Sequence, residues 1–134
     1  MELSTYLFFN GNCKEAFQFY EKTFGGKIEL MMTYGESPEK DKCGPESRDK
    51  IMHVRLKLGN YSLMASDAPP QHYNKPQGFS ISYSVNGKDE AQRLFNALSD
   101  NGTVIMPLGK TFWAESFGMC VDRFGIHWMI NCEH

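Results

Sequence analysis

The sequence predicts an α+β fold of two paired β-α-β-β-β modules, and two hairpins carry this prediction. Residues 112–131 and residues 52–67 each contain two runs of alternating apolar and polar residues on either side of a turn. When the two hairpins are aligned, Met64 falls on Met129, and the segments that precede the hairpins follow the same order. One module alone could not bury its helix face and its sheet edges, so we expect the two to pair.

The first module begins with an apolar and aromatic run at residues 5–10, which is typical of a strand. Asn12 then provides an N-cap, with Glu15 three residues later as in a capping box, and Gly25-Gly26 ends the helix. A second strand follows at residues 27–34, where apolar residues alternate. Helical spacing predicts one buried face, made of Cys13, Ala16, Phe17, Tyr20 and Phe24.

Two irregular segments set the expected boundaries. Residues 35–49 are polar, hold two prolines and show no period, which predicts a loop that is either functional or mobile. Residues 68–78 contain three prolines and separate the halves, but they are too few to link independent domains. We therefore expect a single domain over residues 1–134, with module one at 1–67, a connector, and module two at 79–134.

The second module repeats this pattern of segments. A strictly alternating strand at residues 79–85 precedes a helix at residues 88–99, whose first turn carries two acidic residues where the helix dipole favours them. A strand at residues 103–107 then leads into the last hairpin. The helix is expected to bury Ala91, Leu94, Phe95 and Leu98.

Composition and charge narrow the range of functions. The 134 residues carry 14 basic and 16 acidic side chains, a net charge of −2, and no basic run, so nucleic acid is not expected as a partner. No apolar run approaches the ~18 residues of a membrane helix, and a strand begins close to Met1, so we expect no membrane span, no signal peptide and a cytoplasmic location. The cysteines lack metal-binding spacing and are expected to be free thiols: Cys13, Cys43, Cys120 and Cys132.

Alternation within the strands sorts their residues onto two faces. Aligning Glu15-Ala16 with Glu90-Ala91 places Thr5 on Ser80, and we assign both to the face turned away from the helices. The nearly apolar set expected to pack on the helices is Tyr6, Phe8, Ile28, Leu30, Met32, Met52, Val54, Leu56, Leu58, Leu63, Ala65, Ile81, Tyr83, Val85, Phe117, Met119, Val121, Trp128 and Ile130.

The opposite set mixes small hydroxyls, histidines and methionines with a few apolar groups. It contains Thr5, Leu7, Phe9, His53, Arg55, Lys57, Ser62, Met64, Ser66, Ser80, Ser82, Ser84, Ser116, Gly118, Cys120, His127, Met129 and Asn131. A solvated face would carry more Lys and Glu, so we expect this set to line a concavity whose polar groups orient a ligand. The alternative is an ordinary outer sheet face.

Short motifs spread over the whole chain carry a resemblance to a known family. They are Tyr6-Leu-Phe-Phe-Asn-Gly-Asn, Ala16-Phe-Gln-Phe-Tyr, Phe24-Gly-Gly, Met64-Ala-Ser-Asp, Met106-Pro-Leu, Thr111-Phe-Trp, Phe117-Gly-Met and Asp122-Arg-Phe-Gly-Ile-His-Trp-Met. This pattern resembles the PhnB-like branch of the vicinal oxygen chelate superfamily, which includes glyoxalase I, extradiol dioxygenases, and bleomycin- and fosfomycin-resistance proteins.

The resemblance implies curved open sheets with a concave ligand cavity, and usually a homodimer. Some members of the branch carry the label demethylubiquinone methyltransferase. This sequence contains no glycine-rich methyl-donor motif, so we do not extend that activity to it.

The resemblance also implies where a metal would be held. Enzymes of the superfamily commonly bind a divalent metal with four side chains, two from the first strands and two from the fourth strands of the modules. Here those places fall at Thr5 and Ser80, and at Met64 and Met129. Hydroxyl and thioether groups do not suit zinc, nickel, iron(II) or manganese, so we expect neither a metal site nor a cofactor.

Three titratable side chains are candidates for acid–base chemistry. His53 and His127 fall on the expected concave face and could exchange a proton near neutral pH. Each could equally be a strand histidine that bonds a neighbour. Asp67 could act as a base, or it could accept a backbone N–H and end its strand.

The leading hypothesis is metal-independent binding of a small, partly apolar molecule on the concave face, with sequestration as one such role. Phe112 and Trp113 could form a wall of this site or a core or dimer contact. The alternative is a metal-dependent or His/Asp-based enzyme of lyase or isomerase type. The expected ligand-contacting set is Thr5, Leu7, Phe9, His53, Ser62, Met64, Ser80, Ser82, Phe112, Trp113, His127 and Met129.

Overall fold

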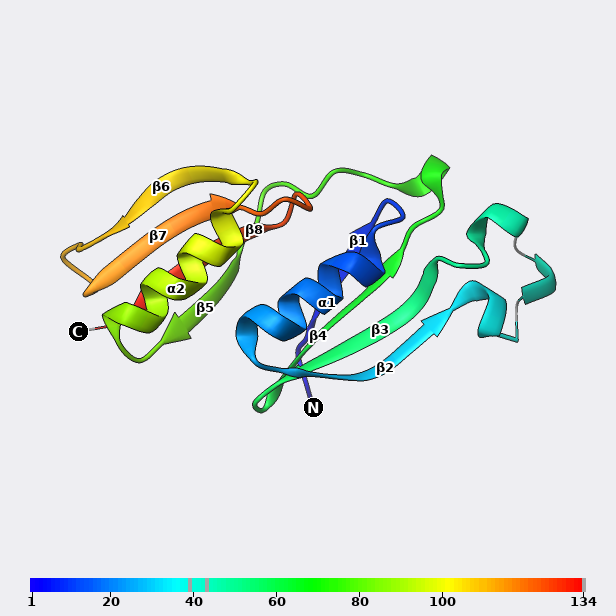
Figure 1. Cartoon of the computed structure of the whole chain (residues 1–134), viewed down its shortest axis with the longest axis horizontal. Helices are drawn as coiled ribbons and strands as arrows, with labels where there is room; N and C mark the ends of the chain where they lie inside the picture. The colour runs from blue at the N-terminus through cyan, green and yellow to red at the C-terminus, as the bar shows by residue number, and fades with distance from the viewer. Residues whose placement is uncertain (39, 43, 134) are drawn as a thin grey trace. The chain divides into compact units, whose positions relative to one another are not determined.

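The computed structural model describes residues 1–38, 40–42 and 44–133. Cys43 lies outside these residues, so its expected free thiol stays a prediction. The chain divides into two compact units, Met1–Asn74 and Lys75–His134, each with a four-stranded sheet and an α-helix (Figure 1). The organisation of both modules as a single domain also remains a prediction.

The first unit has the order strand, helix and three further strands. Its elements are β1 (Thr5–Phe9), α1 (Cys13–Phe24), β2 (Lys27–Thr33), β3 (Ile51–Leu58) and β4 (Tyr61–Asp67). The sheet order is β1-β4-β3-β2, with β1 parallel to β4 and the other pairs antiparallel. The unit is therefore the expected β-α-β-β-β module.

The second unit repeats this topology. Its elements are β5 (Ile81–Val85), α2 (Lys88–Ser99), β6 (Thr103–Gly109), β7 (Ser116–Val121) and β8 (His127–Cys132). The sheet order is β5-β8-β7-β6, and the parallel pair is β5 with β8. The α+β class and the duplicated module are thus confirmed, with two open mixed sheets.

The segment between β2 and β3 contains local structure that its sequence did not predict. Its described part forms 3-10 turns at Tyr34–Glu36, Lys40–Lys42 and Pro45–Ser47, and the connector forms one at Pro70–His72. The first of these turns has a complete capping box, in which the Thr33 hydroxyl accepts from the backbone N–H of Glu36 at 3.2 Å.

Each helix covers one face of its own sheet (Figure 1). The predicted helix faces are buried at Cys13, Ala16, Phe17 and Tyr20 on α1, and at Ala91, Leu94, Phe95 and Leu98 on α2, whereas Phe24 at the end of α1 is half-buried. Gly25 ends α1 in the left-handed conformation, with φ of 72°, and its N–H donates to the carbonyl of Glu21. Hydrophobic burial against the sheets supplies most of the stability of such helices.

The predicted faces of β1 are wrong by one residue. Leu7 and Phe9 are only 2% and 1% exposed and lie on the α1 side of the sheet. Tyr6 and Phe8 are 39% and 54% exposed and lie on the opposite side. Leu7 and Phe9 are therefore core residues, not ligand contacts of an uncovered face.

The length of one loop explains this error. Residues 10–12 join β1 to α1, whereas only residues 86–87 join β5 to α2. Aligning the two helices therefore matched Thr5 with Ser80, although its structural counterpart is the next residue, Ile81. Because side chains alternate along a strand, a shift of one residue exchanges its two faces.

The faces of β7 are also reversed relative to the prediction. Gly118 lies directly under α2, since a Cβ atom built on it would stand 2.7 Å from Cε1 of Phe95. Ser116 and Cys120 share this buried face, while Met119 and Val121 lie on the other. The small residues of β7 thus make room for the helix and do not hollow out a ligand site.

A bulge in β2 makes the predicted face of Leu30 and Met32 wrong. The register shifts between Ile28 and Leu30, so that Ile28 stays on the α1 side while Leu30 lies opposite Arg55 and Met32 opposite His53. Leu30 is 44% exposed. One extra residue in a strand has the same effect as a register slip, and the strict alternation expected here could not reveal it.

Candidate functional site

The face of the first sheet turned away from α1 gathers the most chemically varied side chains of the first unit. Tyr6, Met64, Arg55 and Leu30 form one row across β1, β4, β3 and β2, because each is the register partner of the next. We call this surface the first open face and define it as Tyr6, Phe8, Leu30, Met32, His53, Arg55, Ser62, Met64 and Ser66, with Lys27 and Lys57 at one end.

Aromatic and imidazole rings are grouped on the first open face. The Tyr6 hydroxyl lies 3.3 Å from Nδ1 of His53, within hydrogen-bond distance, and the two rings are stacked with centroids 5.8 Å apart. The ring of Phe8 lies 5.2 Å from that of Tyr6. These contacts arise because β1 and β3 both flank β4, which brings residues 47 positions apart together.

Arg55 is half-buried in the middle of this face. Its guanidinium donates to the sulfur of Met64 at 3.8 Å, a weak acceptor. Among the described residues, no carboxylate lies within ion-pair distance of Arg55. Lys27 and Lys57 are register partners at one end of the same face, so the surface is basic.

The corresponding face of the second sheet is neutral apart from one histidine. We call it the second open face and define it as Ser82, Ser84, Phe117, Met119, His127, Met129 and Asn131. Trp113 packs edge-on against Phe117 with ring centroids 5.3 Å apart, and Phe112 packs on Trp113 at 4.8 Å. The Asn131 side-chain oxygen is buried and has no hydrogen-bond partner in the described part of the chain.

The structure distributes the predicted ligand contacts over several places. On the open faces lie Ser62, His53 and Met64 of the first sheet, and Ser82, His127 and Met129 of the second. Thr5 lies on the α1 side opposite Leu63, and Ser80 precedes β5. Phe112 is 92% exposed and Trp113 is 47% exposed.

Sequence reasoning missed Tyr6 and Phe8 as open-face residues, and it gave Arg55 no role. The unequal connections at residues 10–12 and 86–87 were the signal for the first two. Nothing in the sequence pattern shows that Arg55 lacks an acidic partner within the described part of the chain, because that depends on which strands lie side by side.

The corrected register gives a sharper test of the metal site that the resemblance implies. Tyr6 is the register partner of Met64, and Ser82 is the register partner of Met129. The places that the resemblance implies for metal ligands therefore carry a phenol and a thioether in the first unit, and a hydroxyl and a thioether in the second. None of these groups is a good ligand for a divalent metal, and among the described residues no three His, Cys, Asp or Glu side chains come together.

Asp67 is held entirely by backbone groups of the first unit. Its Oδ1 accepts from the N–H groups of Gly11 at 2.9 Å and Cys13 at 3.0 Å, and its Oδ2 accepts from Ile51 at 2.8 Å. The side chain is buried, with 3% of the residue exposed. Asp67 therefore caps α1 in place of Asn12, whose side chain makes no capping bond.

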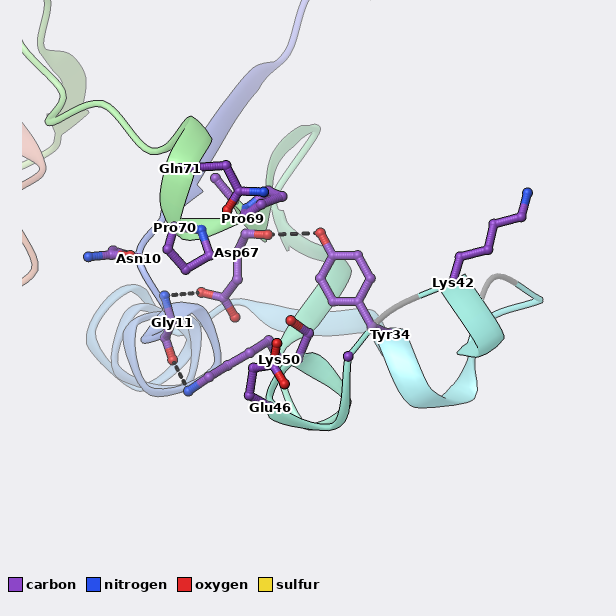
Figure 2. A pocket seen from close by; sticks show the side chains of 13 residues that line it. Asn10, Gly11, Tyr34, Lys42, Glu46, Lys50, Asp67, Pro69, Pro70 and Gln71 are labelled. Atoms are coloured by element: carbon purple, nitrogen blue, oxygen red, sulfur yellow. Dashed lines mark hydrogen bonds between the residues drawn. The ribbon is translucent and has the colours of Figure 1, made fainter.

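A cavity of about 570 Å³ lies beside Asp67, at the end of the first unit (Figure 2). Lys50 donates from Nζ to the carbonyl of Gly11 at 3.1 Å, and the Tyr34 hydroxyl donates to the carbonyl of Asp67 at 2.9 Å. Both side chains donate to backbone carbonyls, so we assign Lys50 the role of holding the β1–α1 connection to the start of β3, and Tyr34 that of holding the end of β4 to the segment after β2.

Asp122 has a matching role in the second unit. Its Oδ1 accepts from the N–H groups of Phe124 at 2.8 Å and Ile126 at 3.0 Å, and its Oδ2 accepts from the indole N–H of Trp128 at 2.8 Å. These bonds hold the turn between β7 and β8. The turn that the sequence predicts before the last strand is therefore held by the carboxylate of Asp122.

Two thiols of the described residues are poor nucleophiles. Burial, with a smaller contribution from Asp67, raises the pKa of the Cys13 thiol well above its ordinary value. Burial and then Asp122 raise the pKa of Cys120 to about 11. Thiolates are the reactive form, so both cysteines act as packing residues.

The repeated β-α-β-β-β module defines the fold class of the chain. A glyoxalase/bleomycin resistance/dioxygenase family enzyme from Burkholderia phytofirmans has the same fold, with a TM-score of 0.67 over 98% of this chain and 97% of its own, at 14% identity. At that identity the likeness shows the fold alone. No helix among the described residues is long and apolar enough to cross a membrane.

Comparison of the sequence then gives the family. The family model described as 3-demethylubiquinone-9 3-methyltransferase matches residues 1–131, and the chain belongs to this family. Protein YjdN of Escherichia coli strain K12 is 33% identical over 139 residues, spanning 98% of this chain and 95% of YjdN.

Two solved structures are similar over nearly the whole chain. Protein PA1353 from Pseudomonas aeruginosa has 52% identity and a TM-score of 0.92, covering 99% of this chain and 98% of its own. A PhnB protein from Bacillus cereus, described as a putative 3-demethylubiquinone-9 3-methyltransferase, has a TM-score of 0.84 at 24% identity over 98% of this chain and 99% of its own. The predicted membership of the PhnB-like branch is confirmed.

Proposed function

We propose that this chain binds a small, partly apolar molecule on an open sheet face without the help of a metal ion. The first open face supports this proposal best, because it combines two exposed aromatic rings, an imidazole, a thioether and a half-buried guanidinium. Small-molecule sites commonly pair apolar walls with a few polar groups that fix orientation.

The chemistry of the donor set supports metal independence. Tyr6 and Met64 are register partners at the first-module places where the resemblance implies metal ligands, and neither group favours a divalent ion. A phenol and a thioether can instead contact an apolar ligand directly.

The test is a ligand screen on the full chain with ¹³C-methyl methionine labelling, with and without a chelator. We expect aromatic and amphiphilic compounds to shift the Met64 methyl signal equally in both conditions. Elemental mass spectrometry after exposure to Zn²⁺, Ni²⁺, Mn²⁺ and Fe²⁺ should find well below one metal per chain.

S-adenosylmethionine belongs in the same screen as a control for methyl-donor binding, which the proposal does not include. The proposal would be refuted by ligand shifts that require added metal. A panel in which no compound moves the methyl signals of Met64 or Met129 would also refute it.

A further inference from the structure

We infer that the first open face takes an aromatic oxyanion and that Arg55 determines this specificity. This inference rests on the proposed function and adds the charge class of the ligand to it. It comes from the charged side chains at the described, paired positions of this face, which are basic.

Neither acidic residue of the first sheet occupies a paired position of the first open face. The four strands of this sheet contain two carboxylates, Glu29 and Asp67. Asp67 is turned to the α1 side, where three backbone N–H groups bind it. Glu29 is exposed at the bulge of β2. The paired positions of the first open face thus carry only basic or neutral groups.

Arg55 has unused hydrogen-bonding capacity at the centre of this surface. A guanidinium offers five N–H donors in a planar fork, and here the side-chain acceptor it contacts is the sulfur of Met64 at 3.8 Å. A half-buried cation without a carboxylate partner has lost part of its hydration without full compensation. A planar oxyanion would supply two strong acceptors to the fork.

The same row of the sheet supplies the aromatic contact. Tyr6 lies two strands away from Arg55, with Met64 between them. Two strand spacings amount to about 10 Å. A two-ring aromatic carboxylate can place its oxygens at Arg55 and its rings over Met64 and Tyr6, whose side chain is 39% exposed.

The second open face provides an internal comparison. It has the same strand order, but its titratable side chain is His127, and its other members are hydroxyl, amide, thioether and aromatic groups. A preference for anions should therefore be confined to the first open face. This difference makes the Met129 methyl signal a suitable control.

The experiment compares 2-naphthoate with the neutral isostere 2-naphthamide on the full chain, by calorimetry and methionine methyl NMR. We expect naphthoate to bind roughly tenfold more tightly, since charge-assisted hydrogen bonds are about twice as strong as neutral ones. Its binding should shift Met64 and leave Met129 unchanged.

Arg55→Met should abolish this preference, because it retains an unbranched apolar chain and removes the charge. Lys57→Met is the matched control on the same strand and face. Lys57 is exposed, and screening should limit its effect to about twofold.

Equal affinities for the two probes would overturn the inference and leave the proposed function standing. So would an anion preference that survives Arg55→Met. Failure of both probes to shift Met64 would count against both proposals at this face. If Arg55→Met instead changes the sedimentation mass, the face contacts a second copy of the chain and the inference is wrong.

Discussion

The hydrogen-bond donors around Asp67 and Asp122 show that both buried carboxylates have a structural role. Each carboxylate accepts three hydrogen bonds from N–H donors of its own unit. Asp67 joins the starts of α1 and β3 to the end of β4, and Asp122 closes the turn before β8. Since both oxygens of each carboxylate are engaged, these residues position the backbone around the open faces.

We expect Asp67→Asn to lower the free energy of unfolding by about 2–3 kcal/mol, because three bonds to a charged acceptor become bonds to an amide with one acceptor oxygen. Urea denaturation followed by circular dichroism measures this change. Asp49→Asn is the control, since Asp49 is an exposed acid in the same unit. Equal stability of the two variants would contradict the capping role of Asp67.

At the level of elements, the close approach of α2 to β7 explains the small residues of that strand. A Cβ atom built on Gly118 would stand 2.7 Å from Cε1 of Phe95 and 3.0 Å from Cα of Leu108. The contact is therefore with backbone as well as with a side chain. A packed interior of this kind has little room to relax.

Gly118→Ala should destabilise the protein by about 1–3 kcal/mol, the usual range for overpacking. Gly109→Ala is the matched control on the neighbouring strand, because no atom lies within 4 Å of its built Cβ. Thermal and urea unfolding of both variants give the comparison. A Gly118 variant as stable as the Gly109 variant would show that α2 does not lie so close to β7.

Across the whole molecule, each unit has one covered and one open sheet face, and several large apolar side chains are exposed. Phe8 is 54% exposed, Ile105 is 56% exposed and Phe112 is 92% exposed. Exposed apolar side chains mark an interaction surface where they form a contiguous patch. Together with the family resemblance, they support the prediction that the chain forms a homodimer.

Sedimentation velocity tests this prediction without assuming which surface is involved. At tens of micromolar we expect a species with twice the mass of the chain, and progressive dilution should move the distribution toward a single chain, as mass action requires. A single-chain mass at every concentration would contradict the prediction of a homodimer.

Much of the fold could be predicted from local pattern. The helix at residues 88–99 and the strand at residues 61–67 have the predicted bounds, and Gly25 ends α1 as its residue type suggests. These features depend on neighbours a few positions apart, through helical period, alternation and backbone freedom. Relations between residues a few positions apart can be read directly from a sequence.

The candidate site was less predictable because it depends on register. Strand alternation shows which residues share a face, but not which face is covered by a helix. A three-residue connection before α1 and a bulge in β2 exchanged the assigned faces of Tyr6, Leu7 and Leu30. Each change involves one residue, and one residue is half the period of a strand.

The sequence by itself determined the duplicated module, its order of elements and its family, since these follow from short-range pattern and from motifs along the whole chain. Only the tertiary structure decided that Asp67 caps a helix and that Arg55 has no acidic partner among the described residues. Both facts depend on groups far apart in sequence that strand pairing and helix packing bring together.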